Sequence, residues 1–166
     1  MQELSIRRAS PDDVVLILKF INELALYEKA PEEVTATEAD IQNSLFGAEP
    51  HCYGLICSLD DEAVGFAVYF YNYSTWLGKP GLYLEDIYVT PVSRGHGAGK
   101  FLMRHLAQIA VSKGCERFEW AVLDWNKSAR VFYESIGAEA KTEWVGYRLS
   151  GPAIHDLAQT QLQHPY

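Results

Sequence analysis

Residues 83–102, YLEDIYVTPVSRGHGAGKFL, join an apolar run to a helical pattern through a glycine-spaced loop. The run over 82–90 is rich in β-branched and aromatic residues and predicts a strand. Apolar residues at helical spacing predict a helix over 97–113, and a further strand follows over 117–123. The stretch therefore predicts a β-α-β unit with a right-handed crossover. Ligands of such sheets bind near the carboxyl ends of the parallel strands, which is where the glycines lie.

The remaining patterns predict a mixed sheet around this unit. Apolar residues at helical spacing predict helices over 11–28, from about 37 to 46, and over 127–136. Runs of β-branched and aromatic residues predict strands over 4–8, 52–59, 63–73 and 139–150. The order is β-α-α-β-β-β-α-β-α-β, and the tail from Gly151 has only a weak pattern. We expect one α/β (α+β) domain over 1–166, with a mostly antiparallel twisted sheet and helices on both faces.

The loop Arg94-Gly95-His96-Gly97-Ala98-Gly99 has glycines at alternate positions. Glycine leaves neighbouring backbone N–H groups open to close approach. The first amides of the helix that follows have no internal partner and carry partial positive charge. The pattern predicts a phosphate nest, to which Arg94 can add a charged contact. A flexible turn is the alternative, and the loop matches neither a Walker motif nor a GxGxxG motif.

Two adjacent acids, Glu85 and Asp86, stand inside the apolar strand before the loop. Acids in such a strand are expected to be buried, and buried acids need partners. A cationic substrate is a suitable partner, and desolvation together with mutual repulsion would raise one of the two pKa values. The alternative is that both are structural acids that accept hydrogen bonds from backbone amides.

Composition excludes several other classes of function. The formal net charge of −8 disfavours a nucleic-acid ligand, because an acidic protein repels phosphate backbones. Cys52, Cys57 and Cys115 fit neither a disulfide framework nor a tight metal cluster, so we expect buried free thiols in a reducing cytoplasm. The histidines show no metal-like spacing, and we expect no metal. No run reaches the roughly 18 apolar residues of a membrane helix, and the first ten residues resemble no signal peptide.

The loop Arg94–Gly99 resembles the R/Q-x-x-G-x-G/A pyrophosphate loop of the GNAT acyltransferase superfamily. Other stretches resemble its spermidine/spermine and thialysine N-acetyltransferases: Tyr73–Trp76, Tyr83–Val89 and Ala121–Asn126. Tyr27-Glu28 also matches, and the resemblance extends over about residues 4–150. It implies a GNAT-like fold, acetyl-CoA as co-substrate, and acetyl transfer to the primary amine of a small cation by direct attack in a ternary complex. It also implies a cytoplasmic homodimer.

The resemblance further implies roles for single residues. Glu85 would be the general base, Asp86 would help to hold the distal ammonium, and Tyr133 would be the general acid for the leaving thiolate. The residues implied to bind acetyl-CoA are Ile87, Tyr88, Val89, Arg94, Gly95, His96, Gly97, Ala98, Gly99, Lys100, Asn126, Lys127, Ser128, Ala129 and Tyr133. Those implied to bind the amine are Tyr27, Glu28, Trp76, Glu85, Asp86, Glu119, Trp120 and Ala121.

Plainer interpretations exist for several of these residues. Tyr133 lies on the apolar face of its predicted helix, where an aromatic residue usually belongs to a core. Asn126 is also a suitable N-cap for that helix, and the two roles are compatible. The pair Tyr27-Glu28 is also compatible with a solvated helix end.

The sequence departs from the family at two positions. Spermidine/spermine enzymes carry an acid two residues before the tryptophan, where this chain has Ser74, as the thialysine enzymes do. This favours a shorter amine or a lysine analogue over a long polyamine. A family Gly-Trp pair appears here as Gly146-Tyr147. The alternatives are a GNAT enzyme for another amine, such as a protein lysine or an aminoglycoside, and a non-catalytic CoA-binding regulator.

Overall fold

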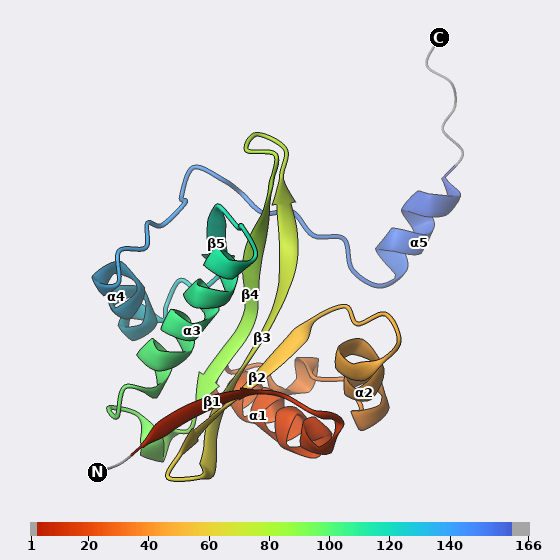
Figure 1. Cartoon of the computed structure of the whole chain (residues 1–166). Coiled ribbons are helices and arrows are strands. Elements are labelled where there is room, and N and C mark those ends of the chain that lie inside the picture. The colour runs from red at the N-terminus through yellow and green to blue at the C-terminus, as the bar shows by residue number, and fades with distance from the viewer. Residues whose placement is uncertain (1–2, 161–166) are drawn as a thin grey trace. The chain divides into compact units, whose positions relative to one another are not determined.

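A five-stranded sheet organises the first part of the chain in the computed structural model, which describes residues 3–160 (Figure 1). The strands are β1 (Leu4–Arg8), β2 (Tyr53–Leu59), β3 (Glu62–Ser74), β4 (Lys79–Val89) and β5 (Arg117–Trp120). They lie in the order β1-β2-β3-β4-β5. Neighbours from β1 to β4 are antiparallel, and only β4 and β5 are parallel. The predicted mixed, mostly antiparallel sheet is confirmed.

Two compact units divide the chain, Met1–Leu123 and Asp124–Tyr166. The helices are α1 (Val14–Tyr27), α2 (Glu38–Phe46), α3 (Ala98–Ser112), α4 (Lys127–Ser135) and α5 (Pro152–Gln159). Short 3₁₀ helices occupy Pro11–Asp13, Pro31–Glu33 and Pro91–Ser93. The first unit holds the sheet with α1, α2 and α3, and the second holds α4 and α5. That the whole chain acts as one catalytic domain stays a prediction.

Helices cover both faces of the sheet, as predicted. The ring of Phe20 on α1 lies 5.6 Å from that of Phe66 on β3 and 5.9 Å from that of Tyr88 on β4, between centroids. Phe66 and Val68 belong to this core cluster. Ala67 stands between them on the opposite face of β3 and is also fully buried. There α3 packs against β3 and β4 (Figure 1).

The start of α1 is anchored to β1 by an ion pair. Both terminal nitrogens of Arg7 donate to the Asp13 carboxylate at 2.7 Å, and the Ser10 N–H donates to it at 2.7 Å. The hydrogen bonds from Arg7 are the main cause that lowers the pKa of Asp13 to about 2. Because this pKa lies below that of an unfolded aspartate, the pair stabilises the fold at neutral pH. Its contribution is lost as the pH falls through about 2.

The predicted elements of the first unit are all present, with small shifts at their ends. β4 begins at Lys79, three residues before the predicted start at 82, and β5 ends at Trp120 rather than at 123. The three cysteines are free, as predicted, but only Cys57 is fully buried while Cys52 and Cys115 are half-buried.

The predicted strand over 139–150 is wrong. This segment contains no strand and has a turn at Thr142 and Glu143. Lys141 lies between two acids, with its Nζ 3.8 Å from Glu139 and 3.9 Å from Glu143. All of its residues are exposed, and the strand pairings of residues 3–160 do not include them. The tail, left unassigned by its pattern, forms α5 after Gly151 and Pro152.

Candidate active site

A bulge in β4 lies at the acid pair. Val68 of β3 pairs with Asp86, whereas the next residue, Tyr69, pairs with Leu84, so Glu85 is an extra residue in β4. A bulge bends the strand and redirects side chains that strict alternation would send to opposite faces. The sequence indicated this bulge, because two adjacent acids do not fit the alternation of side chains between the two faces of a strand.

Beyond the bulge, β4 also loses its second neighbour. The pairing of β4 with β5 ends at Leu84 and Trp120. Among residues 3–160, no strand pairs with 85–89 on that side. Backbone N–H and C=O groups at an unpaired edge can bind an extended ligand as a strand would. Ile87, Tyr88 and Val89, predicted to bind the donor arm through their backbone, lie in this stretch.

The two acids differ in burial, which corrects the expectation that both are buried. Glu85 is exposed, and Asp86 is half-buried. Burial is the main cause that raises the pKa of Asp86 to about 6, and the charges of Glu85 and Glu28 raise it further. Burial also raises the pKa of Glu28, which follows the last residue of α1. The cysteine Cys52 lies near as well, since both strand acids raise the pKa of its thiol after the larger effect of burial.

Other residues predicted to bind the amine lie at different places. Trp120 pairs with Leu84, directly before the bulge, and the side chain of Glu119 accepts a hydrogen bond from Asn72 at 3.2 Å. Ala121 is exposed and follows the end of β5. These three positions border the point where β4 and β5 separate.

Trp76 lies apart from the acids within the chain. It stands in the turn between β3 and β4 and is 82% exposed. From Asp86 to Lys79, at the near end of this hairpin, the strand extends roughly 20 Å at about 3.3 Å per residue. The length of the hairpin therefore separates Trp76 from the acids, and its part in an amine site stays a prediction.

The glycine loop leads from β4 into α3 and fits an anion. Gly95 and Gly97 have φ angles of 86° and 85°, which favour glycine, and Gly97 is the N-cap of α3. Gly99 has no such φ, and a Cβ at Gly95, Gly97 or Gly99 would meet no protein atom within 4 Å. Neither packing nor backbone conformation requires glycine at position 99, where it weakens the helix. The predicted approach of a pyrophosphate to the first amides of α3 would account for it, and stays a prediction.

Charged and polar side chains surround this loop. Lys100 and Arg94 are exposed, and Nδ1 of His96 lies 3.3 Å from the carbonyl oxygen of Ser93. Nε of Arg94 donates to the Val89 carbonyl at 3.1 Å, and its guanidinium carbon lies 4.8 Å from the ring centroid of Tyr27. Sequence reasoning missed this contact between the loop and α1, because nothing local to either segment indicates it.

The second unit carries the remaining predicted residues on and before α4. The side chain of Asn126 caps this helix, accepting from the N–H of Ala129 and from the hydroxyl of Ser128, both at 3.3 Å. Tyr133 is half-buried, and its ring centroid lies 5.5 Å from that of Phe132. The predicted cap is confirmed, whereas the donor contacts of Lys127–Ala129 and the acid role of Tyr133 stay predictions.

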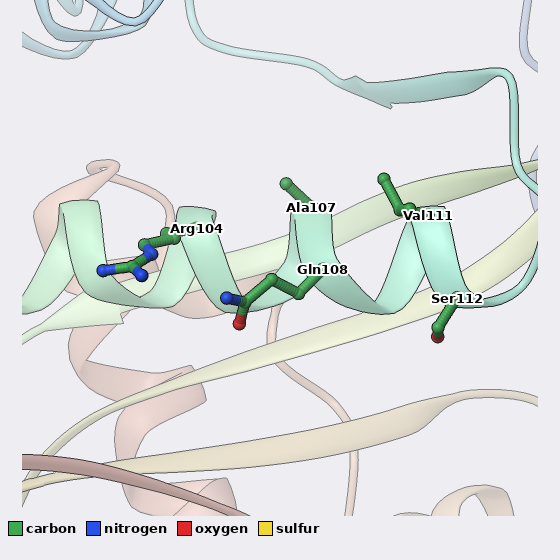
Figure 2. A pocket seen from close by; sticks show the side chains of 5 residues that line it. All are labelled: Arg104, Ala107, Gln108, Val111 and Ser112. Carbon is green, nitrogen blue, oxygen red and sulfur yellow. The ribbon is translucent and has the colours of Figure 1, made fainter.

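A separate hollow on the outer side of α3 has no chemistry of its own. Figure 2 shows its lining side chains, Arg104, Ala107, Gln108, Val111 and Ser112. It has a volume of about 410 Å³, is open, and contains none of the predicted site residues. In the described part of the chain, no group of three or more His, Cys, Asp or Glu residues is arranged to hold a metal ion. Over the same residues, no helix has the length and apolarity to span a membrane.

Comparison with known families identifies the chain. The acetyltransferase (GNAT) family matches residues 18–138, which include the bulge, the glycine loop and the whole of α4. The chain belongs to the GNAT acetyltransferase family. The thialysine N-epsilon-acetyltransferase of Bos taurus is 40% identical to this GNAT chain over 169 residues, covering 95% of the chain and 99% of the relative. The L-ornithine N5-acetyltransferase NATA1 of Arabidopsis thaliana is 32% identical, covering 92% and 86%.

A solved structure agrees with the GNAT fold. An integron cassette protein from the mobile metagenome of V. cholerae superposes with a TM-score of 0.79 at 29% identity, covering 95% of this chain and 98% of that one. The predicted membership of the GNAT superfamily and its thialysine and diamine branch is confirmed by the family match and the relatives. This GNAT protein is an acetyl-CoA-dependent N-acetyltransferase of the thialysine and diamine branch.

Proposed function

We propose that the chain acetylates the primary amine of a small cationic substrate of the diamine or thialysine type. The observation that carries this proposal is the meeting of three carboxylates at the β4 bulge. Glu85 and Asp86 come from the strand and Glu28 from the end of α1, close enough for both glutamates to raise the pKa of Asp86. Carboxylates that repel one another at a partly buried site are stabilised by a bound cation.

Glu85 is proposed as the general base for this amine. An alkylamine has a pKa of about 10, so it arrives protonated and must lose a proton before it can attack. Glu85 is exposed and can pass that proton to solvent, directly or through water. Asp86, which is half-buried, would hold the second charge of the substrate together with Glu28. Tyr27 would add a cation–π contact beside them.

The residues present fit acetyl-CoA, which supplies the acetyl group as an activated thioester. The loop amides at Gly95–Gly99, which Arg94 precedes, and the side chain of Lys100 would hold its pyrophosphate. The unpaired backbone at Ile87–Val89 would hold the arm. In the second unit, Asn126–Ala129 would add contacts, and the Tyr133 hydroxyl would donate the proton that the leaving thiolate needs.

A short amine or an amino-acid side chain fits the site better than a long polyamine. Ser74 stands where the polyamine enzymes carry an acid, and it serves the turn instead: it is buried and accepts from the N–H of Leu77 at 3.2 Å. The names of the Bos taurus and Arabidopsis thaliana relatives specify thialysine and ornithine, two amino acids with a side-chain amine. We therefore infer that thialysine is preferred over spermidine.

A panel of amines tests the proposal. Purified protein with acetyl-CoA is assayed with thialysine, ornithine, putrescine and spermidine, and with an aminoglycoside and a lysine-containing peptide. The expected result is the highest kcat/KM for thialysine or ornithine. A preference for the aminoglycoside or the peptide would contradict the substrate class. CoA binding without turnover of any amine would favour the regulator. Size-exclusion chromatography with light scattering tests the expected homodimer, and cell fractionation tests the cytoplasmic location.

A further inference from the structure

Arg94 connects three parts of the first unit. It begins the glycine loop, and its Nε donates to the Val89 carbonyl of β4 at 3.1 Å. Its guanidinium carbon lies 4.8 Å from the ring centroid of Tyr27 on α1 and 5.9 Å from that of Tyr88 on β4. Both distances lie within the range of a cation–π contact. The side chain is therefore directed onto the end of α1.

The two tyrosines differ in burial. Tyr88 is buried, its ring packs 5.9 Å from that of Phe20, and a hydrogen bond with Glu23 adds to the burial that raises its pKa to about 12. Tyr27 is the last residue of α1 and is 37% exposed. The guanidinium of Arg94 thus contacts one ring inside the core and one ring at the surface, at the end of α1.

Tyr27 leads directly to the acids. The next residue is Glu28, whose carboxylate raises the pKa of Asp86 across the gap between α1 and β4. A shift of the Tyr27 ring moves the backbone that carries Glu28. Two side chains, those of Arg94 and Tyr27, therefore connect the glycine loop to the acids at the β4 bulge.

We propose that Arg94 is a positioning residue that couples the donor loop to the amine site through Tyr27. The proposal rests on the function proposed above. A pyrophosphate on the loop amides fixes the backbone from which Arg94 extends, and thereby fixes the contact with Tyr27. The fixed contact makes the donor-bound protein bind the amine more tightly, and the coupling is reciprocal.

A kinetic cycle tests the path. Arg94→Gln is expected to raise the amine KM about two- to fivefold at saturating acetyl-CoA, which is the size of an exposed cation–π contact. Tyr27→Leu raises it as well, and adding Arg94→Gln to Tyr27→Leu raises it no further. Arg104→Gln removes an exposed arginine of α3 outside the site and leaves the amine KM unchanged. Independent, multiplicative effects of Arg94→Gln and Tyr27→Leu would overturn the proposal, since a merely structural arginine does not depend on Tyr27.

A second readout needs no turnover. ¹⁵N-labelled protein is titrated with CoA alone, and the amides of Gly97, Gly99 and Glu28 are followed by NMR. The chemical shifts of all three amides are expected to change in the unaltered chain. In Arg94→Lys, which keeps the charge but loses the planar guanidinium, the glycines still shift and Glu28 does not. A Glu28 shift that persists in Arg94→Lys, or is absent in the unaltered chain, overturns the coupling. If the protein acetylated none of the amines but still showed these chemical-shift changes, the proposed function would be wrong and the coupling would still be supported.

Discussion

The two halves of β4 differ in their neighbours and in their chemistry. Over Lys79–Leu84 the strand runs between β3 and β5, and Leu82 and Leu84 are 0% and 2% exposed. Over Glu85–Val89 it pairs with β3 alone and carries two acids. The change occurs within one residue, at the bulge. The backbone of a strand that is paired on both edges is fully used by the sheet, whereas a free edge can also bind a ligand.

The largest effect should come from the free-edge half. Glu85→Gln is expected to lower kcat about 10²- to 10⁴-fold, the usual contribution of a general base. The melting temperature should not change, because Glu85 is exposed. The loss should be greatest at the low end of the pH range and shrink toward about pH 10, where the amine loses its proton unaided. A loss that is equal at every pH would argue against the base role.

The doubly paired half should respond in stability instead. Leu82→Ala removes a fully buried side chain and should lower the free energy of unfolding by about 2–5 kcal/mol. Urea unfolding measures this loss. The kcat per folded molecule should stay close to that of the unaltered protein, in contrast to Glu85→Gln. A large fall in kcat at full folding would show that the two halves are not separate in function.

The smallest effect distinguishes the two acids from one another. The pKa of Asp86 lies at about 6 in the folded protein, above its unfolded value, so its ionisation destabilises the fold above that pH. Asp86→Asn should therefore stabilise the protein at pH 7.5 by on the order of 1 kcal/mol, allowing for partial exposure. The difference should close as the pH falls from about 6 toward 4, where the folded protein already holds the proton.

The exposed neighbour provides the control for that measurement. At pH 7.5, Glu85→Gln should stabilise the protein much less than Asp86→Asn, because Glu85 is exposed and adds only the smaller, repulsive contribution to the pKa of Asp86. Asp86→Asn should also raise the KM for the amine. Equal stabilisation by the two substitutions, or none by Asp86→Asn at pH 7.5, would contradict the difference in burial between them.

Local patterns predicted most of the first unit. The strand, loop and helix over 82–113 were predicted within a few residues, because apolar periodicity and glycine positions are properties of neighbouring residues. The cap at Asn126 was predicted for the same reason. The strand over 139–150 failed because a strand needs a partner, and its alternating residues say nothing about whether one is present.

The candidate site shows the same division. The glycine loop and the acid pair were found from the sequence, but the burial of Asp86 and the exposure of Glu85 were not. That difference depends on the bulge and on where β5 ends, which are set by pairing between strands. The contact of Arg94 with Tyr27 joins residues from separate elements, and no spacing in the sequence indicates it.

By itself, the sequence determined the family, the β-α-β unit, the position of the glycine loop and the presence of the paired acids before it. Each of these features depends on residues that are close together along the chain. Only the tertiary structure decided which acid is desolvated, which edge of β4 stays open, and that the loop arginine reaches α1. These depend on the distances between elements, since the cost of burying a charge and the strength of a contact are set by what surrounds a side chain in space.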